Sequence, residues 1–230
     1  MARQKSDAEE SPAFTFRAMT DRQQDAAELW RRSRVLFLVG PAGTGKTVTA
    51  LSLAVRESLH PRANHKRIML SRPLVPTDEE MGFLPGTQDE KLGPWLAPFR
   101  DVAQSTVTGC KDQWAGLTKL LKDKECGFEL VPTGMLRGRT VSYGTLILDE
   151  AQNCTRGQLV CALTRMGTGG RVVICGDPQQ PDRLNPPPLL EVMRQVGNLD
   201  TVGVVRFDKS DCVRDPLVIE MIDALCGGAA

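Results

Sequence analysis

Short apolar runs recur along the chain and are separated by segments of mixed polarity. Runs of this kind lie at 35–39 (VLFLV), 67–71 (RIMLS), 145–149 (TLILD) and 171–177 (RVVICGD). Because they are apolar throughout rather than alternating, they predict strands covered on both faces. CGFELVP and TVGVVRF are predicted to be further strands.

Apolar residues spaced three or four positions apart predict helices between these strands. The segment TDRQQDAAELWRRS predicts a first helix from about 20 to 33, and a second helix follows the first strand and ends before Pro61. DEKLGPWLAPFRDVA is helical in part, with breaks expected at Pro94 and Pro98. Two more helices are predicted by the spacing of Leu159, Leu163 and Met166, and of Leu217, Met221 and Leu225.

This alternation predicts an α/β fold with a mostly parallel central sheet and helices on both faces, which makes three layers. We expect one domain over residues 16–226 after a mobile tail at 1–15, and an irregular loop at PQQPDRLNPPPLL. Residues 107–127 carry no assignable motif and are interpreted as a variable insertion.

The overall charge excludes a strongly basic nucleic-acid binder. The net charge of the 230 residues is +1, so any contact with nucleic acid has to come from a local patch. Candidate patches are RRSR at 31–34, RANHKR at 62–67 and RGR at 137–139, although each is more often a solvated face.

Composition also narrows the chemistry and the compartment. No run is long and apolar enough for a membrane helix, and the polar start does not resemble a signal peptide, so we expect a cytoplasmic protein. The seven cysteines form no C-x-x-C pair, and His60 and His65 are interpreted as loop residues. We therefore expect no metal site made of protein ligands alone.

The segment GPAGTGKT has the pattern G-x-x-x-x-G-K-[ST] between a buried strand and an amphipathic helix. Backbone amides of such a loop bind phosphate oxygens, and the helix amino terminus adds partial positive charge. Lys46 would contact the phosphates and Thr47 would coordinate Mg²⁺, whereas the alternative is a plain turn. The expected nucleotide-binding residues are Gly40, Pro41, Ala42, Gly43, Thr44, Gly45, Lys46 and Thr47.

Two further strands end in polar side chains that can complete a hydrolytic site. Asp149 follows a buried strand and could hold Mg²⁺ through water, while Glu150 could act as general base on an attacking water. Alternatively, both carboxylates cap the next helix. In GDPQQ, Asp177 and Gln180 reach the same sheet edge, where an amide could sense the γ-phosphate or hold the water.

The order of these motifs resembles the PhoH-like family of P-loop ATPases, which are related to the first RecA-like domain of superfamily 1 helicases. The matching stretches span roughly residues 35–225 and are GPAGTGKT, LSRPLV, MGFLPGTQDEKLGPWLAPF, MLRGRTV, LILDEAQN, LTRMG, GDPQQPD and DCVRDPLV. The resemblance implies a RecA-like P-loop fold, ATP and Mg²⁺ as ligands, and a homo-oligomer that acts in RNA metabolism. Helicase activity is proposed for some members of the family.

The resemblance also places the arginines. Arg214 and Arg165 fall on matching positions and Arg72 follows the second strand. We hypothesise a ring, possibly a hexamer, in which Arg214 of one subunit reaches the nucleotide of the next. The alternative is that Arg214 is an exposed residue in a salt bridge. Gln23 or Gln24 could read an adenine edge, or could be a solvated helix residue.

The sequence is compatible with three functions. The first is a Mg²⁺-dependent ATPase acting on or near RNA, or another single-stranded nucleic acid, as a homo-oligomer. The second is a nucleotide-gated interaction module that hydrolyses slowly and recruits an RNA-processing partner. A small-molecule kinase is disfavoured because no acceptor pocket or lid is recognisable. The text QPDRLNPPP departs from the family pattern, so we expect a reshaped loop after Gln180.

Overall fold

A six-stranded sheet forms the centre of the structure, a computed structural model that describes residues 12–62, 64–73, 88–180, 188–215, 217, 220 and 221. The strand order is β5-β3-β6-β7-β2-β8, and every neighbouring pair is parallel. The bounds are β2 Val35–Val39, β3 Arg67–Arg72, β5 Gly127–Pro132, β6 Gly144–Leu148, β7 Arg171–Gly176 and β8 Val202–Arg206.

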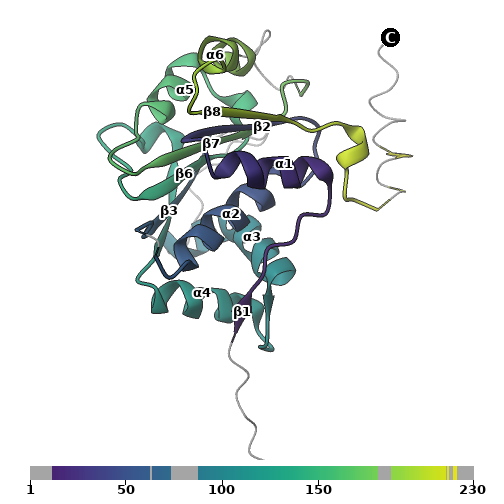
Figure 1. The fold of residues 1–230 in the computed structure, drawn as a ribbon, viewed down its shortest axis with the longest axis vertical. Helices are drawn as coiled ribbons and strands as arrows, with labels where there is room; N and C mark the ends of the chain where they lie inside the picture. The colour runs from purple at the N-terminus through teal and green to yellow at the C-terminus, as the bar shows by residue number, and fades with distance from the viewer. Residues whose placement is uncertain are drawn as a thin grey trace, which may run out of the picture.

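The central strands are buried because helices cover both faces of the sheet. Every residue of β2, β6 and β7 is buried. Two hydrophobic clusters result, one on each face, and Leu36 and Phe37 of β2 belong to opposite clusters. Figure 1 shows α1 to α4 on one side of the sheet and α5 and α6 on the other. The predicted α/β class and three layers are therefore confirmed.

Two of the helices begin after a threonine whose side chain caps the helix amino terminus. Thr20 caps α1 and accepts a hydrogen bond from the Gln23 amide, and Thr155 forms a capping box with Gln158 before α5. The bounds are α1 Asp21–Trp30, α2 Lys46–Leu59, α3 Gln88–Thr106, α4 Gln113–Asp123, α5 Arg156–Leu163 and α6 Pro188–Val196. The described residues also form three short 3₁₀ helices, η1 Thr133–Met135, η2 Ala151–Asn153 and η3 Lys209–Asp211.

Three features differ from the sequence-based predictions. The helix α3 runs through Pro94 and Pro98 without the expected breaks, and the burial of Pro98, Phe99 and Val102 shows that packing outweighs the lost backbone hydrogen bonds. The helix α6 was not predicted. Residues 13–15, assigned to a mobile tail, are paired instead: β1 Ala13–Phe14 forms an antiparallel ladder with β4 Val107–Thr108.

The segment 107–127, which carries no assignable motif, forms part of the helical layer that contains α1 to α4. Its helix α4 packs on α2, on α3 and against β1. The reshaped loop expected after Gln180 and most of the final predicted helix lie outside the described residues. Among the helices that the structure describes, none combines the length and apolar character that a bilayer crossing requires.

Candidate nucleotide-binding site

The P-loop, residues 40–47, joins the carboxyl end of β2 to the amino end of α2. Gly43 and Gly45 have φ values of +81° and +77°, which residues other than glycine rarely adopt, so these glycines allow the turn. Gly45 precedes α2 and provides no side-chain cap. The first amides of α2 are therefore not capped by the preceding side chain, as a phosphate-binding helix terminus requires.

Lys46 lies inside the loop. Its Nζ donates hydrogen bonds to the carbonyl oxygens of Gly40 at 2.7 Å and Pro41 at 2.6 Å. Burial lowers the pKa of this ammonium, while the carboxylates of Asp177, Glu150 and Asp149 act in the opposite direction. The loop carbonyls thus hold a partly desolvated cation that an anionic phosphate can satisfy better than they can.

Asp149 is the buried carboxylate at the end of β6, with 3% of its surface exposed. One of its oxygens accepts a hydrogen bond of 2.7 Å from the Thr47 hydroxyl. The other accepts two from the Arg72 guanidinium, at 2.8 Å from Nε and 2.5 Å from Nη2. A hydroxyl and a carboxylate side by side are oxygen ligands of the kind that Mg²⁺ uses.

Glu150 is exposed, unlike Asp149, because the chain turns sharply between them. Its φ of +53° places it in the left-handed region. Its Oε2 accepts a 2.7 Å hydrogen bond from the Gln152 amide, whose own oxygen accepts a 3.0 Å bond from the Asp177 backbone N–H. The Gln152 side chain therefore ties the ends of β6 and β7 together and holds the Glu150 carboxylate.

A hollow of about 370 Å³ opens over these groups. It is lined by the P-loop and by Arg72, Asp149, Glu150, Asp177, Gln180 and Arg214, among others. Cys175 is completely buried below it, and burial raises the pKa of its thiol well above the ordinary value, so the thiol remains protonated. The hollow has both charged and apolar lining residues and collects groups from four strand ends, as expected at the carboxyl edge of a parallel sheet.

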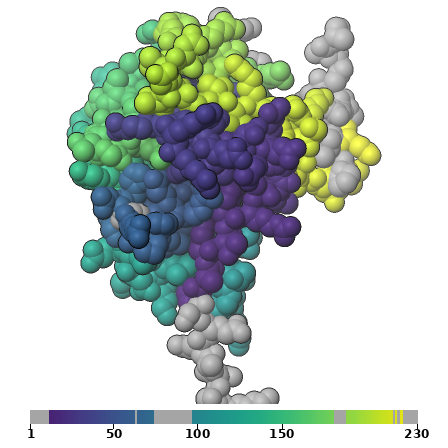
Figure 2. All heavy atoms as spheres, viewed as in Figure 1, coloured from purple at the N-terminus to yellow at the C-terminus, as the bar shows by residue number. Residues whose placement is uncertain are grey.

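Arg214 lies over the P-loop of its own chain. A Cβ added to Gly43 would come within 2.8 Å of its Cδ, and the neighbouring Val213 N–H donates a 3.1 Å hydrogen bond to the Gly43 carbonyl. The side chain is exposed, and no carboxylate pairs with it within the described part of the chain. In Figure 2 the segment after β8 lies beside the amino-terminal part of the chain on the visible face.

A family model described as PhoH-like protein matches residues 15–226. The chain belongs to the PhoH-like family. A PhoH-like protein of Bacillus subtilis (strain 168) is 36% identical over 214 residues, covering 91% of this chain and 64% of the relative. Protein PhoH of Escherichia coli (strain K12) is 35% identical over 186 residues, covering 80% and 51%. The chain thus spans about half to two thirds of the length of these PhoH relatives.

Solved structures confirm the RecA-like P-loop fold of this PhoH-like chain. The large terminase of a thermophilic bacteriophage has a TM-score of 0.54 at 12% sequence identity, over 90% of this chain and 50% of the terminase. The same terminase in complex with ADP gives a TM-score of 0.53 at 12% identity, over 90% and 50% of the two chains. At this identity the likeness concerns the fold alone.

The structure brings most of the predicted site residues of the PhoH-like chain together. The P-loop, Asp149, Glu150, Gln180 and Arg214 surround the one hollow. Arg165 lies elsewhere: its guanidinium bonds the carbonyl of Cys161 in α5, and it does not line this hollow. A role of Arg214 in a neighbouring subunit stays a prediction, and in its own chain the residue already lies at the P-loop.

The two glutamines of α1 separate clearly. Gln23 is 5% exposed; its amide donates to the Thr44 carbonyl at 3.3 Å and its oxygen accepts from the Met19 amide at 2.9 Å. Gln24 is exposed and bonds Glu28 on its own helix. Gln23 therefore supports the P-loop directly, and its contact with an adenine stays a prediction.

Sequence reasoning did not assign a role to Arg72 or to Gln152. Arg72 could have been found from its place as the last residue of a parallel strand, because the carboxyl ends of these strands face the P-loop edge. Gln152 could have been found as the amide two residues beyond the candidate base. The described residues contain no group of three or more histidine, cysteine or acidic side chains suited to a metal.

Proposed function

We propose that this chain is a Mg²⁺-dependent ATPase that works as a homo-oligomer in RNA metabolism, in the cytoplasm. The observation that supports hydrolysis most directly is the position of Glu150, exposed at the P-loop hollow and held by Gln152. A module that only binds nucleotide has little need for a carboxylate positioned there. The family resemblance supports the role in RNA metabolism and the oligomer.

Each group has a distinct part in the proposed reaction. The P-loop amides and Lys46 bind the phosphates, while Thr47 and Asp149 would hold Mg²⁺, which neutralises phosphate charge when bound. Glu150 accepts a proton from the attacking water, and Gln180 orients that water. Arg214, which lies close to Gly43, would contact phosphate charge that develops as the bond breaks.

Arg72 pairs with Asp149, and we interpret this contact as the resting state of the proposed ATPase. In the structure its guanidinium occupies one oxygen of Asp149 with two hydrogen bonds. When Mg²⁺ is bound, the Asp149 carboxylate would hold the cation in place of Arg72. The Arg72 guanidinium would then be free to contact phosphate in the hollow.

The same contact supports a second candidate function. A chain whose Asp149 carboxylate stays paired with Arg72 would bind nucleotide and hydrolyse it slowly. It would then act as a nucleotide-gated module that recruits an RNA-processing partner. The two functions differ in whether turnover depends on Glu150.

The test is the rate of ATP hydrolysis with Mg²⁺, with and without single-stranded RNA or DNA, over a range of protein concentrations. Glu150→Gln is expected to lower the rate about 100-fold or more while nucleotide still binds, because the general base is removed. RNA stimulation that rises with protein concentration would support the oligomeric, RNA-coupled ATPase.

Glu125→Gln is the matched control. Glu125 is also exposed and has a φ of +54°, but it follows α4 and does not line the P-loop hollow. Its variant is expected to hydrolyse ATP at the unaltered rate. Equal rates in the unaltered chain and in Glu150→Gln, with nucleotide bound in both, would contradict the ATPase and support the module.

A further inference from the structure

Two basic segments of the sequence have no role in the P-loop site, yet the fold brings them together. Arg31 belongs to RRSR at the end of α1, and Arg62 belongs to RANHKR after α2. Both line a hollow of about 820 Å³, together with Arg56, Arg171 and Tyr143. We call it the arginine hollow, and Figure 2 shows the end of α1 beside the loop that follows α2.

The arginine hollow lies at the opposite edge of the sheet from the P-loop. Its residues come from the carboxyl ends of α1 and α2 and from the positions that precede or begin β3, β6 and β7. The P-loop follows the carboxyl end of β2 and leads into α2. The two hollows are therefore separate sites joined by α2, which is about 21 Å long at 1.5 Å per residue.

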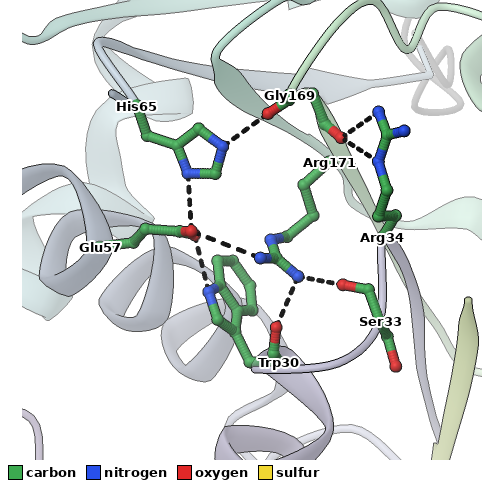
Figure 3. Close-up of polar contacts among 8 residues, drawn as sticks. Trp30, Ser33, Arg34, Glu57, His65, Gly169 and Arg171 are labelled. Carbon is green, nitrogen blue, oxygen red and sulfur yellow. Dashed lines mark hydrogen bonds and ion pairs between the residues drawn. The ribbon is translucent and has the colours of Figure 1, made fainter. Parts of the chain in front are cut away.

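The one carboxylate among the described residues that line this hollow belongs to Glu57, and it already has partners, as Figure 3 shows. It accepts hydrogen bonds from His65 Nδ1 at 2.8 Å and from Trp30 Nε1 at 2.7 Å. It also forms an ion pair with Arg171, at 3.4 Å. The Glu57 carboxylate is therefore shared between His65 and Arg171. Because the hollow contains further arginines, its lining residues together carry a net positive charge.

Arg171 fixes the floor of the hollow. It is 91% buried, its guanidinium lies 4.3 Å from the Trp30 ring centroid, and it donates to the carbonyls of Trp30 and Ser33 (Figure 3). Its Nε is buried without a hydrogen-bond partner among the described residues. A buried donor without an acceptor costs free energy, which the cation–π contact and the other hydrogen bonds of Arg171 offset.

The rim carries arginines that no carboxylate pairs with, as far as the structure describes the chain. These are Arg31, Arg56 and Arg62. Burial, and then the like charge of Arg31, lower the pKa of Arg56, while Glu57 raises it. The like charges of Arg31 and Arg56 repel each other, and an anion bound between them would offset this repulsion.

Tyr143 adds an aromatic surface to the rim. It is 48% exposed, and its φ of +48° holds it at a sharp turn before β6, with its ring against Gly169. A large apolar ring is exposed here next to unpaired guanidinium groups. Stacking on an aromatic ring beside positive charge is how proteins bind single-stranded nucleic acid without reading its sequence.

We propose that the arginine hollow binds the sugar–phosphate backbone of a single-stranded nucleic acid, with Tyr143 stacking on a base. Guanidinium groups bind phosphate oxygens in pairs, and the exposed ring suits a base better than an acidic peptide. The inference rests on the proposed role in RNA metabolism and adds to it the place where the strand lies, away from the nucleotide.

The test is fluorescence anisotropy with a labelled oligouridine of about 20 nucleotides, titrated at several salt concentrations. The double variant Arg31→Ala, Arg62→Ala is expected to bind at least about tenfold more weakly. The slope of log K against log salt should fall in magnitude by about 1.4, because each lost phosphate contact on a single strand removes about 0.7.

The matched control is Arg32→Ala, Arg194→Ala, which removes the same charge. Both residues line a different hollow, between α1, α6 and β8, and Arg32 is adjacent to Arg31 in the chain. The control should bind the oligouridine with unaltered affinity. Tyr143→Leu should weaken binding about fivefold or more with no change in salt slope, since stacking releases no counterions.

Three results would overturn the inference. Unaltered affinity in the first double variant is one, and equal loss in both double variants is another, since that would mean attraction by net charge only. The third is that the Arg31→Ala, Arg62→Ala variant loses binding to a labelled oligoglutamate but retains binding to the oligouridine, which would indicate an acidic protein partner. Melting temperatures of all variants show whether each chain is folded.

ATP hydrolysis is measured on the same samples without RNA. Loss of oligouridine binding in the first double variant, in a chain that shows no hydrolysis at all, would reject the ATPase and retain the nucleic-acid site. Active hydrolysis together with unaltered oligouridine binding in that variant would reject the site and retain the ATPase. The two proposals can therefore fail separately.

Discussion

At the scale of single residues, the P-loop depends on backbone positions that leave no room for a side chain. Gly43 shows this most clearly, because it combines a φ of +81° with the close approach of Arg214 and Cys212. An added Cβ would come within 2.8 Å of Arg214 and 3.0 Å of the Cys212 sulfur. The close approach of Arg214 and Cys212 to the P-loop therefore depends on the absence of a side chain at Gly43.

Gly43→Ala is expected to weaken ATP binding about tenfold or more and to lower the melting temperature. The alanine strains a left-handed position and displaces Arg214 from the loop. The binding constant of a fluorescent ATP analogue and a thermal melt measure the two effects.

Gly134→Ala is the control for this substitution, because nothing lies within 4 Å of the added carbon and Gly134 is not among the glycines with positive φ. It should bind ATP as the unaltered chain does. Unaltered ATP affinity in Gly43→Ala would mean that Arg214 does not press on the P-loop.

At the scale of elements, the strands could be predicted well and the contacts between them could not. Apolar runs that bury both faces mark β2, β6 and β7 by composition alone. The sheet order places Arg72 of β3 beside Asp149 after β6, and this follows from long-range pairing that no local pattern encodes. The helix α6 was missed because its prolines suggested a loop, although Pro188 occupies its first turn, where proline is tolerated.

The end of α2 is joined to the start of β7 through a histidine, and this contact makes stability depend on pH. His65 donates to Glu57 on α2, and its other ring nitrogen lies 2.6 Å from the Gly169 carbonyl. Two acceptors require two N–H groups, which only the charged imidazole has. The hydrogen bond to Glu57 accordingly raises the pKa of His65 above 6.5.

The stabilising contribution of His65 is expected to be complete below about pH 6.5 and to be lost as the pH rises through the folded-state pKa. Melting temperatures of the unaltered chain should therefore fall more steeply than those of His65→Gln as the pH rises above about 6.5. Burial alone would raise the pKa of Glu57, but His65 and Arg171 lower it, so Glu57 stays ionised throughout.

The exposed His60 serves as the control for the pH dependence. His60→Gln should keep the same pH profile as the unaltered chain. Parallel profiles for the unaltered chain and His65→Gln would show that the imidazole contributes nothing to the link between α2 and β7.

At the scale of the whole molecule, nucleotide binding should stabilise every element, because the P-loop hollow collects groups from four strand ends. A ligand that binds only the folded state adds about 2.7 kcal/mol at 100 times its dissociation constant. For a chain of this size, the expected rise in melting temperature is roughly 5–10 °C with Mg²⁺ and ATP.

Lys46→Ala should abolish most of this rise, and removal of Mg²⁺ by a chelator should reduce it, since Thr47 and Asp149 would lose their cation. The exposed Lys119 on α4 offers the control, and Lys119→Ala should show the full rise. An equal rise in Lys46→Ala would place the nucleotide elsewhere on the molecule.

Among the residues that the structure describes, β5 and β8 each have one edge that pairs with no other strand, and both of these strands carry charge. Glu129 of β5 is half-buried and paired with Arg67 and Arg139, and Arg206 of β8 is exposed. Charged side chains on an outer strand discourage the edge-to-edge joining that leads to aggregation. Copies of this chain that assemble would therefore meet through helices and loops, and the sheet itself would remain six strands wide in each copy.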